Sequence, residues 1–384
     1  MGAGTIQSAD FLVIGAGIAG LSLAARLANH GTVIVLEAED APGYHASGRS
    51  VAFAHFGLGE HVVRTLTAMS LDELGAVPSD NRARYARPHP ALHIARADQI
   101  EALDTLVEVH EHFGCDCERL SGEAAGAFVP VLKTGSDFVA KALLDRGALK
   151  LDTDAMLQGG LRDIRARGGE LYCGAKVHSI SREASHWTAK TPIGHFKAPV
   201  LVNASGAWAD EVARMAGVLP ISIEPRRRTV IAFDAPANLP TADWPFVKTV
   251  GDGFYLLPEG KSQLLASPQD EGMSEPCDAA PEELDIATIA HRIEQASELK
   301  ISRIAHSWAG LRSFAPDELP VAGFDPNAPG YFWFAGQGGY GFQTSPALAD
   351  IGEALALRRG LPARFGEQGI HPALFSPNRF VSAT

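Results

Sequence analysis

The segment at residues 10–37 contains, in order, a short apolar strand, a glycine-rich turn, a helix and a second apolar strand. The first strand, FLVI, leads into Gly15, Gly17 and Gly20, which have the spacing G-x-G-x-x-G. In such a turn the first glycine permits the tight bend, the second lets the backbone approach a pyrophosphate, and the third lets helix and strand pack closely. The helix N-terminus offers unpaired N–H groups to phosphate oxygens. The alternative is a glycine-rich turn in an unrelated α/β domain.

The second strand of this unit, Val33–Leu36, ends at Glu37, whose carboxylate is placed to accept a hydrogen bond from a ribose 2′-hydroxyl. A carboxylate at this position disfavours a 2′-phosphate. The segment therefore predicts a site for an ADP-type dinucleotide other than NADP, but the motif alone does not separate NAD from FAD.

Length and charge narrow the class of protein further. A chain of 384 residues exceeds one ordinary core, which favours two domains. Its net charge of −12 argues against a nucleic-acid or anionic-membrane partner. The four cysteines lack zinc-site spacing, so no metal is predicted. No signal peptide or transmembrane segment is recognisable, and we expect a cytoplasmic protein.

Two later apolar strands also lead into glycine-rich turns, ASGAW at 204–208 and GQGGYG at 336–341. Three such turns predict an α/β fold with one Rossmann-like nucleotide-binding domain built from discontinuous segments. The intervening segments contain short alternating strands, which predict an α+β substrate domain with a mostly antiparallel sheet. The predicted nucleotide-binding domain comprises residues 1–80, 143–207 and 305–384, and the predicted substrate-binding domain comprises residues 81–142 and 208–304.

Several ordered motifs connect the chain to a known superfamily. PGYHxxGRS begins at Pro42, VLVNASGAWAD at Val200, HxWAGLRSF at His306 and QGGYGxQTS at Gln337. Together with EPxRR and FYLxP they resemble the D-amino-acid oxidase/dehydrogenase superfamily of flavoproteins, which includes glycine and sarcosine oxidases. Within it, the chain looks most similar to bacterial FAD-dependent D-arginine dehydrogenases. The resemblance covers about residues 8–380 and implies FAD as the cofactor.

The resemblance also implies how FAD is held. Residues 306–320 contain no counterpart of the flavin-linking cysteine of sarcosine oxidases, so we expect non-covalent FAD. The glycine-rich turn at 336–341 can approach the flavin ring, and a helix starting near Thr344 would stabilise negative charge there. The alternative for this turn is an ordinary connection between a strand and a helix. For Arg49, which we expect to contact the cofactor, the alternative is an arginine at the protein surface. The predicted cofactor contacts are Gly15, Gly17, Ile18, Ala19, Gly20, Glu37, Ala38, His45, Ser47, Arg49, Ser50, Val177, Ala204, Gly206, Trp208, Gly310, Arg312, Gly338, Gly339, Tyr340, Gly341, Gln343 and Thr344.

Three residues match those that bind the substrate carboxylate in the resembling dehydrogenases: Arg228, Tyr255 and Arg312. The carbonyl of Gly339 matches a glycine that accepts a hydrogen bond from the substrate amine, and His55 is placed to tune the protonation of that amine. Alternatives remain for each side chain. For the two arginines, Arg312 could pair with an internal carboxylate and Arg228 could belong to a solvated basic strand. For the other two, Tyr255 could pack in a core and His55 could have no chemical role.

The sequence departs from the D-arginine dehydrogenase pattern in the substrate pocket. The acid that meets the substrate guanidinium falls on Ala91, and the pocket histidine and lid tyrosine fall on Phe53 and Leu58. The loop at 52–59 contains no carboxylate. A buried guanidinium without a counter-charge is costly, so we expect D-arginine and D-lysine to be poor substrates and neutral or apolar D-amino acids to be better ones.

These features predict an enzyme of amino-acid catabolism that transfers a hydride from Cα of a D-amino acid to flavin N5. The imino acid then hydrolyses to a 2-oxo acid and ammonia. No lysine lies within 262–267, although Lys261 is close, which favours a dehydrogenase that uses a quinone or another carrier over an O2-dependent oxidase. Alternatives are oxidation of an N-substituted glycine, a cyclic imino acid or a 2-hydroxy acid, or a flavin-binding protein without turnover.

Overall fold

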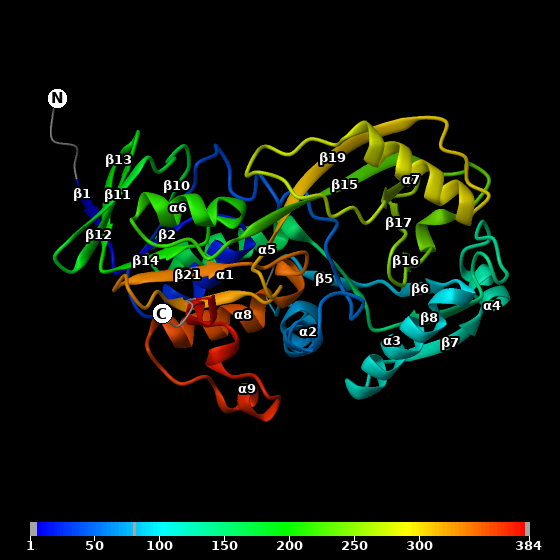
Figure 1. The fold of residues 1–384 in the computed structure, drawn as a ribbon, viewed down its shortest axis with the longest axis horizontal. Coiled ribbons are helices and arrows are strands. Elements are labelled where there is room, and N and C mark those ends of the chain that lie inside the picture. Colours follow the sequence, from blue (N-terminus) through cyan, green and yellow to red (C-terminus); the bar gives the residue numbers. More distant parts are fainter. Residues whose placement is uncertain (1–5, 80–81, 381–384) are drawn as a thin grey trace.

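Two large sheets organise the part of the chain that the structure describes, residues 6–79 and 82–380 of this computed structural model. In Figure 1 the first sheet lies to the left with its covering helices, and the long strands of the second extend to the right. Two smaller sheets complete the described part.

The first sheet has six strands in the order β10-β3-β2-β14-β21-β20. Neighbours from β10 to β21 run parallel, and β20 pairs antiparallel with β21. The predicted strands of the glycine-rich unit and the predicted strand before the last glycine-rich turn are confirmed. The strands are β2 (Phe11–Ile14), β3 (Val33–Leu36), β10 (Glu170–Tyr172), β14 (Val200–Asn203), β20 (Val321–Phe324) and β21 (Tyr331–Ala335).

Both faces of this sheet are buried, which explains why its strands are apolar without alternation. Val13 and Val35 point into a core with helices α1, α5 and α8, whereas Leu12 and Ile34 point into a second core with α6 and a four-stranded sheet. The covering elements are α1 (Ile18–Leu27), α5 (Thr153–Ala166), α8 (Gly341–Ala356), α6 (Ala209–Met215), β1 (Ile6–Ser8), β11 (Ser179–Glu183), β12 (His186–Thr191) and β13 (Gly194–Ala198).

The second sheet has eight strands in the order β19-β15-β18-β17-β16-β6-β8-β7. All its pairs are antiparallel except β16 with β6, in agreement with the predicted mostly antiparallel sheet. The strands are β19 (Ile304–Phe314), β15 (Glu224–Asp234), β18 (Gln263–Ser267), β17 (Tyr255–Glu259), β16 (Phe246–Thr249), β6 (Ala91–Ala95), β8 (Lys141–Asp145) and β7 (Cys117–Ser121).

Strand alternation gives this sheet two different faces. On β16, Val247 points into a core closed by α7 (Glu283–Ala296) and α4 (Gly122–Phe128), whereas Phe246 points to the opposite side, toward Tyr255. That opposite side faces the first sheet across the cavity described below.

The remaining elements connect the two sheets. Helix α2 (His61–Gly75) packs on α8, and α3 (Ile100–His112) packs on β6, β7 and β8. Three short strands, β4 (Phe53–Ala54), β9 (Leu149–Leu151) and β5 (Ala86–Pro88), form the remaining sheet, and α9 (Ala363–Glu367) lies near the end of the chain. The domain boundaries stay a prediction; β8 and β19 both pair in the eight-stranded sheet across the predicted boundaries at 143 and 305.

Candidate active site

A cavity of about 760 Å³ runs between the carboxyl ends of the parallel strands and the open face of the eight-stranded sheet. Its wall combines the turns after β2, β14 and β21 with side chains from β15, β16, β17 and β19. The cavity therefore lies where ligands bind in open α/β folds, next to a second sheet that supplies charged side chains.

The glycine-rich turn after β2 is shaped by close backbone approach. Gly15 has φ +103°, and a Cβ atom there would lie 2.5 Å from the carbonyl oxygen of Ala204. A Cβ atom on Gly20 would lie 1.9 Å from the carbonyl oxygen of Gly15. The Ile18 N–H in the first turn of α1 donates to Ser47 Oγ at 2.9 Å. The turn thus brings bare backbone and a helix N-terminus to the cavity, as a pyrophosphate requires.

Glu37 lies at the end of β3 and lines the cavity. Its two carboxylate oxygens accept hydrogen bonds from the backbone N–H groups of Ala16, at 2.8 Å, and Glu39, at 3.0 Å. Because each carboxylate oxygen has a further lone pair, the fixed side chain can still accept a ribose hydroxyl.

His45 presents an unpaired polar atom at the same end of the cavity. Its Nε2 lies 2.9 Å from Glu39 Oε1, and its ring packs 4.5 Å from the Trp208 ring, centroid to centroid. Its Nδ1 is buried without a hydrogen-bond partner among the described residues. A buried polar atom without a partner is unfavourable, so this atom fits a site that is completed by a polar cofactor.

Arg49 is not the solvated surface arginine that the alternative proposed. It donates to the carbonyl oxygens of Ala279, at 2.9 Å, and Ala309, at 3.0 Å, and forms an ion pair with Asp278. Trp308 Nε1 donates to the Arg49 carbonyl at 2.9 Å. The segment at 43–50 is therefore fastened to β19 and to the loop between β18 and α7, residues 268–282, which we call the 268–282 loop.

Of the predicted site residues, all but two line the cavity. Gly20 packs under Gly15 instead, and Thr344 Oγ1 donates to the Tyr340 carbonyl within the helix at 2.9 Å. Neither residue is among those that line the cavity, and their prediction as cofactor contacts stays a prediction. Helix α8 begins at Gly341, three residues before the predicted start, so its N-terminus reaches the cavity.

Arg312 and Arg228 meet at the end of the cavity formed by the eight-stranded sheet. Their Nη2 atoms lie 3.0 and 3.2 Å from Glu271 Oε1, and both guanidinium groups donate to the Asp270 carbonyl. Arg312 thus pairs with an internal carboxylate, that of Glu271, as the alternative reading of this arginine predicted. Yet Arg312 Nε is buried without a partner in the described part of the chain. Burial lowers the pKa of Arg312 to about 10, so it remains charged at neutral pH.

Tyr255 is buried on the cavity face of β17, with its ring 5.6 Å from that of Phe246. Burial raises its pKa, which keeps the hydroxyl protonated at neutral pH. Tyr255 also packs in a core with Val230 and Leu257, so the core-packing alternative and a place at the cavity hold together.

His55 lines the cavity as a neutral side chain. Its Nδ1 accepts from the Gly57 N–H at 3.0 Å, which places the proton on Nε2. Burial, with smaller effects from Lys248 and His110, lowers its pKa to about 3. The Gln343 side chain holds the His55 backbone at two points. Its Nε2 donates to the His55 carbonyl at 3.3 Å, and its Oε1 accepts from the His55 N–H at 3.5 Å. His55 can therefore donate a hydrogen bond but does not supply a cation at neutral pH.

Sequence analysis missed Lys248, which lines the cavity from β16. Its Nζ donates to Gln269 Oε1 at 2.7 Å and to the Thr249 carbonyl at 3.3 Å. Burial, followed by the charges of Arg228 and Arg312, lowers its pKa to about 8. The available clue was a lysine inside the otherwise apolar strand FVKT, a position that requires a functional or structural reason.

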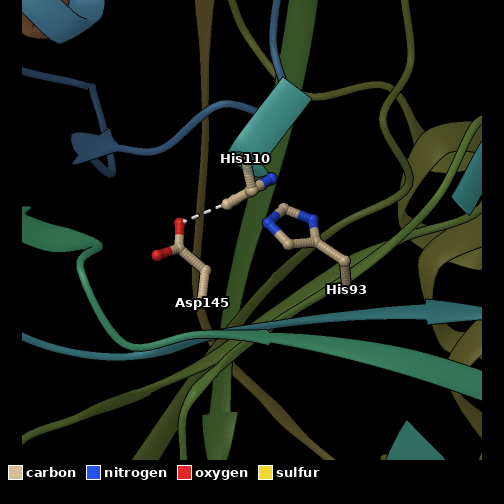
Figure 2. Close-up of side chains that lie close together, drawn as sticks. All are labelled: His93, His110 and Asp145. Atoms are coloured by element: carbon tan, nitrogen blue, oxygen red, sulfur yellow. Dashed lines mark hydrogen bonds and ion pairs between the residues drawn. The ribbon is translucent and has the colours of Figure 1, made fainter. Parts of the chain in front are cut away.

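A second buried cluster lies behind His55 and is shown in Figure 2: His93, His110 and Asp145. His110 has acceptors at both nitrogens, the Leu106 carbonyl at 2.8 Å and Asp145 Oδ2 at 3.1 Å. Both nitrogens of the His110 ring are therefore within hydrogen-bond distance of an oxygen. The three potential ligand atoms of the cluster lie within 4.8 Å of one another, and His93 Nε2 is buried without a hydrogen-bond partner among the described residues.

The fold and the cavity together define a dinucleotide-binding oxidoreductase of two sheets. A family model described as FAD dependent oxidoreductase (DAO) matches residues 10–355, and the chain belongs to this family. FAD is accordingly its cofactor, and the glycine-rich turn, Glu37 and the unpaired Nδ1 of His45 fit it.

Individual proteins resemble the chain in sequence or in fold. The chain is 25% identical to FAD-dependent oxidoreductase domain-containing protein 1 of Mus musculus, over 91% of this chain and 81% of the mouse protein. It superposes on L-proline dehydrogenase from P. horikoshii with a TM-score of 0.80 and 21% identity, covering 98% and 99% of the two chains. Glycine oxidase from Geobacillus kaustophilus gives a TM-score of 0.74 and 22% identity, covering 92% and 95%. Particular closeness to D-arginine dehydrogenases stays a prediction.

Among the described helices, none combines the length and apolar character needed to cross a bilayer.

Proposed function

We propose that the protein oxidises the Cα–N bond of a small amino acid that has a free carboxylate and a non-basic side chain, with the D-enantiomer as the expected form. The observation that carries this proposal is the convergence of Arg228, Arg312 and Tyr255 at one end of a cavity whose other end contains the glycine-rich turn. Two fold relatives are named for amino-acid substrates, proline and glycine, which supports the same class.

The charged end of the cavity fits a carboxylate. The two guanidinium groups supply charge-assisted donors, including the unpaired Nε of Arg312, and the neutral Tyr255 hydroxyl adds another. The Gly339 backbone lies against Arg312, because a Cβ atom there would lie 3.0 Å from Arg312 Cδ. The Gly339 carbonyl is thus proposed as the acceptor for the substrate amine, next to the bound carboxylate.

The bound flavin supplies the hydride acceptor. The protein residues fix the carboxylate so that the Cα–H bond has one orientation, and a bound substrate that loses its ammonium proton is ready for hydride loss. Neutral His55 offers a hydrogen-bond donor at Nε2, but it supplies no positive charge that would lower the pKa of the substrate amine. Hydrolysis of the resulting imino acid to a 2-oxo acid and ammonia completes the proposed reaction.

At the substrate end, the described carboxylates nearest the cavity, Asp270 and Glu271, are already paired with the two arginines and are not among the lining residues, which supports a non-basic side chain. The described acids that line the cavity are Glu37, Glu39, Glu211 and Asp278, and none of these lies on the eight-stranded sheet. Phe53, which occupies the position of a pocket histidine in D-arginine dehydrogenases, stacks on Phe246 at 4.5 Å between ring centroids. D-Arginine and D-lysine would thus meet aromatic rings and cations.

The electron acceptor is a separate proposal. The preference for a dehydrogenase depended on the absence of a lysine near the flavin, and Lys261 is indeed exposed and outside the cavity wall. Lys248 lines the cavity from a different strand, so that argument no longer separates a dehydrogenase from an oxidase. Parallel measurements of O2 uptake and of dye or quinone reduction with the same substrate decide between them.

The test of the main proposal is anaerobic flavin reduction. The FAD-loaded protein is mixed with glycine, N-methylglycine and both enantiomers of alanine, proline, lysine, arginine and lactate. We expect loss of the oxidised-flavin absorbance with D-alanine, and much slower loss with D-arginine and D-lysine. Reduction by lactate alone would favour the hydroxy-acid alternative, and no reduction by any compound would favour a flavin-binding protein without turnover.

A further inference from the structure

Three cations line the substrate end of the cavity, and they are not compensated equally. Arg228 and Arg312 share the carboxylate of Glu271. The partners of Lys248 are both neutral, the amide oxygen of Gln269 and the carbonyl of Thr249. No carboxylate of the described residues lies within ion-pair distance of Lys248 Nζ. Lys248 is thus the cation of this end without a direct carboxylate partner among the described residues, and Glu271 and Asp252 act on its pKa only as weaker, more distant charges.

The position of Lys248 on its strand explains why it reaches the substrate. Lys248 is the register partner of Tyr255, so the two side chains leave the same face of the sheet. Phe246, two residues earlier on β16, lies on that face as well. The wall therefore presents an aromatic ring and then an ammonium group along one strand, beside the arginines.

Burial makes a structural role insufficient for this lysine. The residue is 8% exposed, and an ammonium group in such a place is unfavourable unless an anion compensates it. Its pKa of about 8 leaves it mostly charged at pH 7 despite burial and two neighbouring guanidinium groups. An apolar residue would fill the same place without this penalty, so the charge itself has a use.

We propose that Lys248 binds a second anionic group of the substrate, and that the preferred substrates are dicarboxylic amino acids such as aspartate or glutamate. This inference rests on the proposed function, because it assumes that Arg228 and Arg312 bind the α-carboxylate. The methylene groups of the side chain then lie over Phe246, and the distal carboxylate meets Lys248. The inference agrees with the non-basic side chain proposed above, but it replaces the neutral or apolar side chain expected from sequence by an acidic one.

The test uses isosteric substrate pairs that differ only in charge. The rate of anaerobic flavin reduction is measured for aspartate against asparagine and for glutamate against glutamine, in both enantiomers. The wild-type protein should favour the acid over its amide by about tenfold or more in apparent second-order rate constant, as expected for a charge-assisted hydrogen bond. In Lys248→Met this ratio should fall to near one, and Lys248→Arg should retain a preference for the acid.

A matched control removes a lysine outside the cavity. Lys261→Met changes the net charge by the same amount at an exposed turn, and it should keep the wild-type ratio. Flavin content and melting temperature report whether each variant is folded. If Lys248→Met does not fold, Lys248→Gln takes its place as the variant without the charge, and its ratio should likewise fall to near one.

Two results would overturn the inference. One is a wild-type protein that treats each acid and its amide alike. The other is an unchanged ratio in Lys248→Met with all rates lowered equally, because a lysine that contacts the α-carboxylate or accepts the amine proton affects both members of a pair.

Binding without turnover separates this inference from the proposed function. Succinate and its monoamide are titrated against the flavin absorbance, and the ratio of their dissociation constants is compared in the wild type and Lys248→Met. If no amino acid reduces the flavin but succinate binds in a Lys248-dependent way, the proposed function fails and the anion site stands. If amino acids reduce the flavin without any charge preference, the function stands and the inference fails.

Discussion

Arg312 Nη2 contacts two residues of the 268–282 loop, the carboxylate of Glu271 and the carbonyl of Asp270. Its Nε is buried and has no hydrogen-bond partner among the described residues. Arg228 is held by the same two residues of that loop. Such an arrangement fixes the guanidinium groups before a ligand arrives, which lowers the entropy lost on binding. Removing one of these charges should therefore affect substrate binding directly.

Replacing Arg312 by Met should lower kcat/KM for the best substrate by about 30-fold or more, because truncating one partner of a buried charge pair costs about 2–5 kcal/mol. Stopped-flow flavin reduction measures this loss. Arg227→Met is the matched control: Arg227 lies on the same strand as Arg228 but pairs with Glu282 and Asp285, outside the cavity wall. Equal losses in both variants would contradict the assigned clamp.

His55 predicts a specific pH dependence of stability. Its pKa is about 3 in the folded protein, against an ordinary value of 6.5. Between these values the unfolded chain binds a proton that the folded chain does not, so stability is lost as pH falls from about 6.5 toward 3. The slope attributable to one histidine is at most about 1.4 kcal/mol per pH unit.

His55→Gln should make the acid-side decline shallower, because glutamine does not titrate. Urea unfolding at a series of pH values measures the slope. The groups facing His55 are Lys248, His93 and His110, and His93 contributes in the same direction because burial lowers its pKa as well. Only the difference between wild type and variant therefore tests His55, and identical slopes would show that its folded-state pKa is not depressed.

At the scale of elements, the turn after β2 imposes the strictest requirement on sequence. Gly15 combines a positive φ with a close backbone approach, since a Cβ atom there would lie 2.5 Å from the Ala204 carbonyl oxygen. The backbone strain of a non-glycine residue in such a conformation is about 1–3 kcal/mol, and the steric collision adds to it. The β2–α1 and β14 turns support each other through this contact.

Gly15→Ala should therefore lower the melting temperature and reduce the FAD content of the purified protein. Flavin absorbance relative to protein absorbance measures the second effect. Gly360→Ala is a suitable control, because a Cβ atom at Gly360 meets no atom within 4 Å. Full FAD content and unchanged melting temperature in Gly15→Ala would show that the turn tolerates a side chain.

The same elements show how far sequence reasoning reached. The strands around Gly15 and Glu37 were predictable because a buried parallel strand, a glycine turn and a terminal acid have a fixed order. The helix start predicted near Thr344 is three residues late, because sequence does not fix a helix start without a capping side chain. Lys248 was missed because it reaches the site only through the pairing of β16 with β17, which places it opposite Tyr255. Strand pairing cannot be read from a single sequence.

At the scale of the whole molecule, the cavity extends from the turn after β2 to the open face of the eight-stranded sheet. A cofactor that fills this space contacts both sheets, so it stabilises the folded state by mass action. At a free FAD concentration 100 times the dissociation constant, the gain is about 2.7 kcal/mol. The melting temperature of apoprotein should rise steadily with added FAD, and an unchanged value would contradict binding in this cavity.

Non-covalent attachment makes a related prediction. Cys277 is the cysteine that lines the cavity, on the 268–282 loop. Acid precipitation should leave the yellow flavin in the supernatant, both in the wild type and in Cys277→Ser. Flavin that stays with the wild-type pellet and is released in Cys277→Ser would identify a covalent link to this thiol.

The 268–282 loop has one further consequence. Asp278 and Ala279 fasten Arg49 beside the glycine-rich end of the cavity, and Asp270 and Glu271 fasten the two arginines at the other end. If a carboxylate ligand competes with Glu271 for these arginines and thereby shifts the loop, it also disturbs the contacts of Arg49 beside the predicted FAD site. By thermodynamic reciprocity, such a ligand must change the affinity for FAD by the same factor as FAD changes the affinity for the ligand. Binding of the cofactor and binding of the substrate are then thermodynamically coupled through this loop.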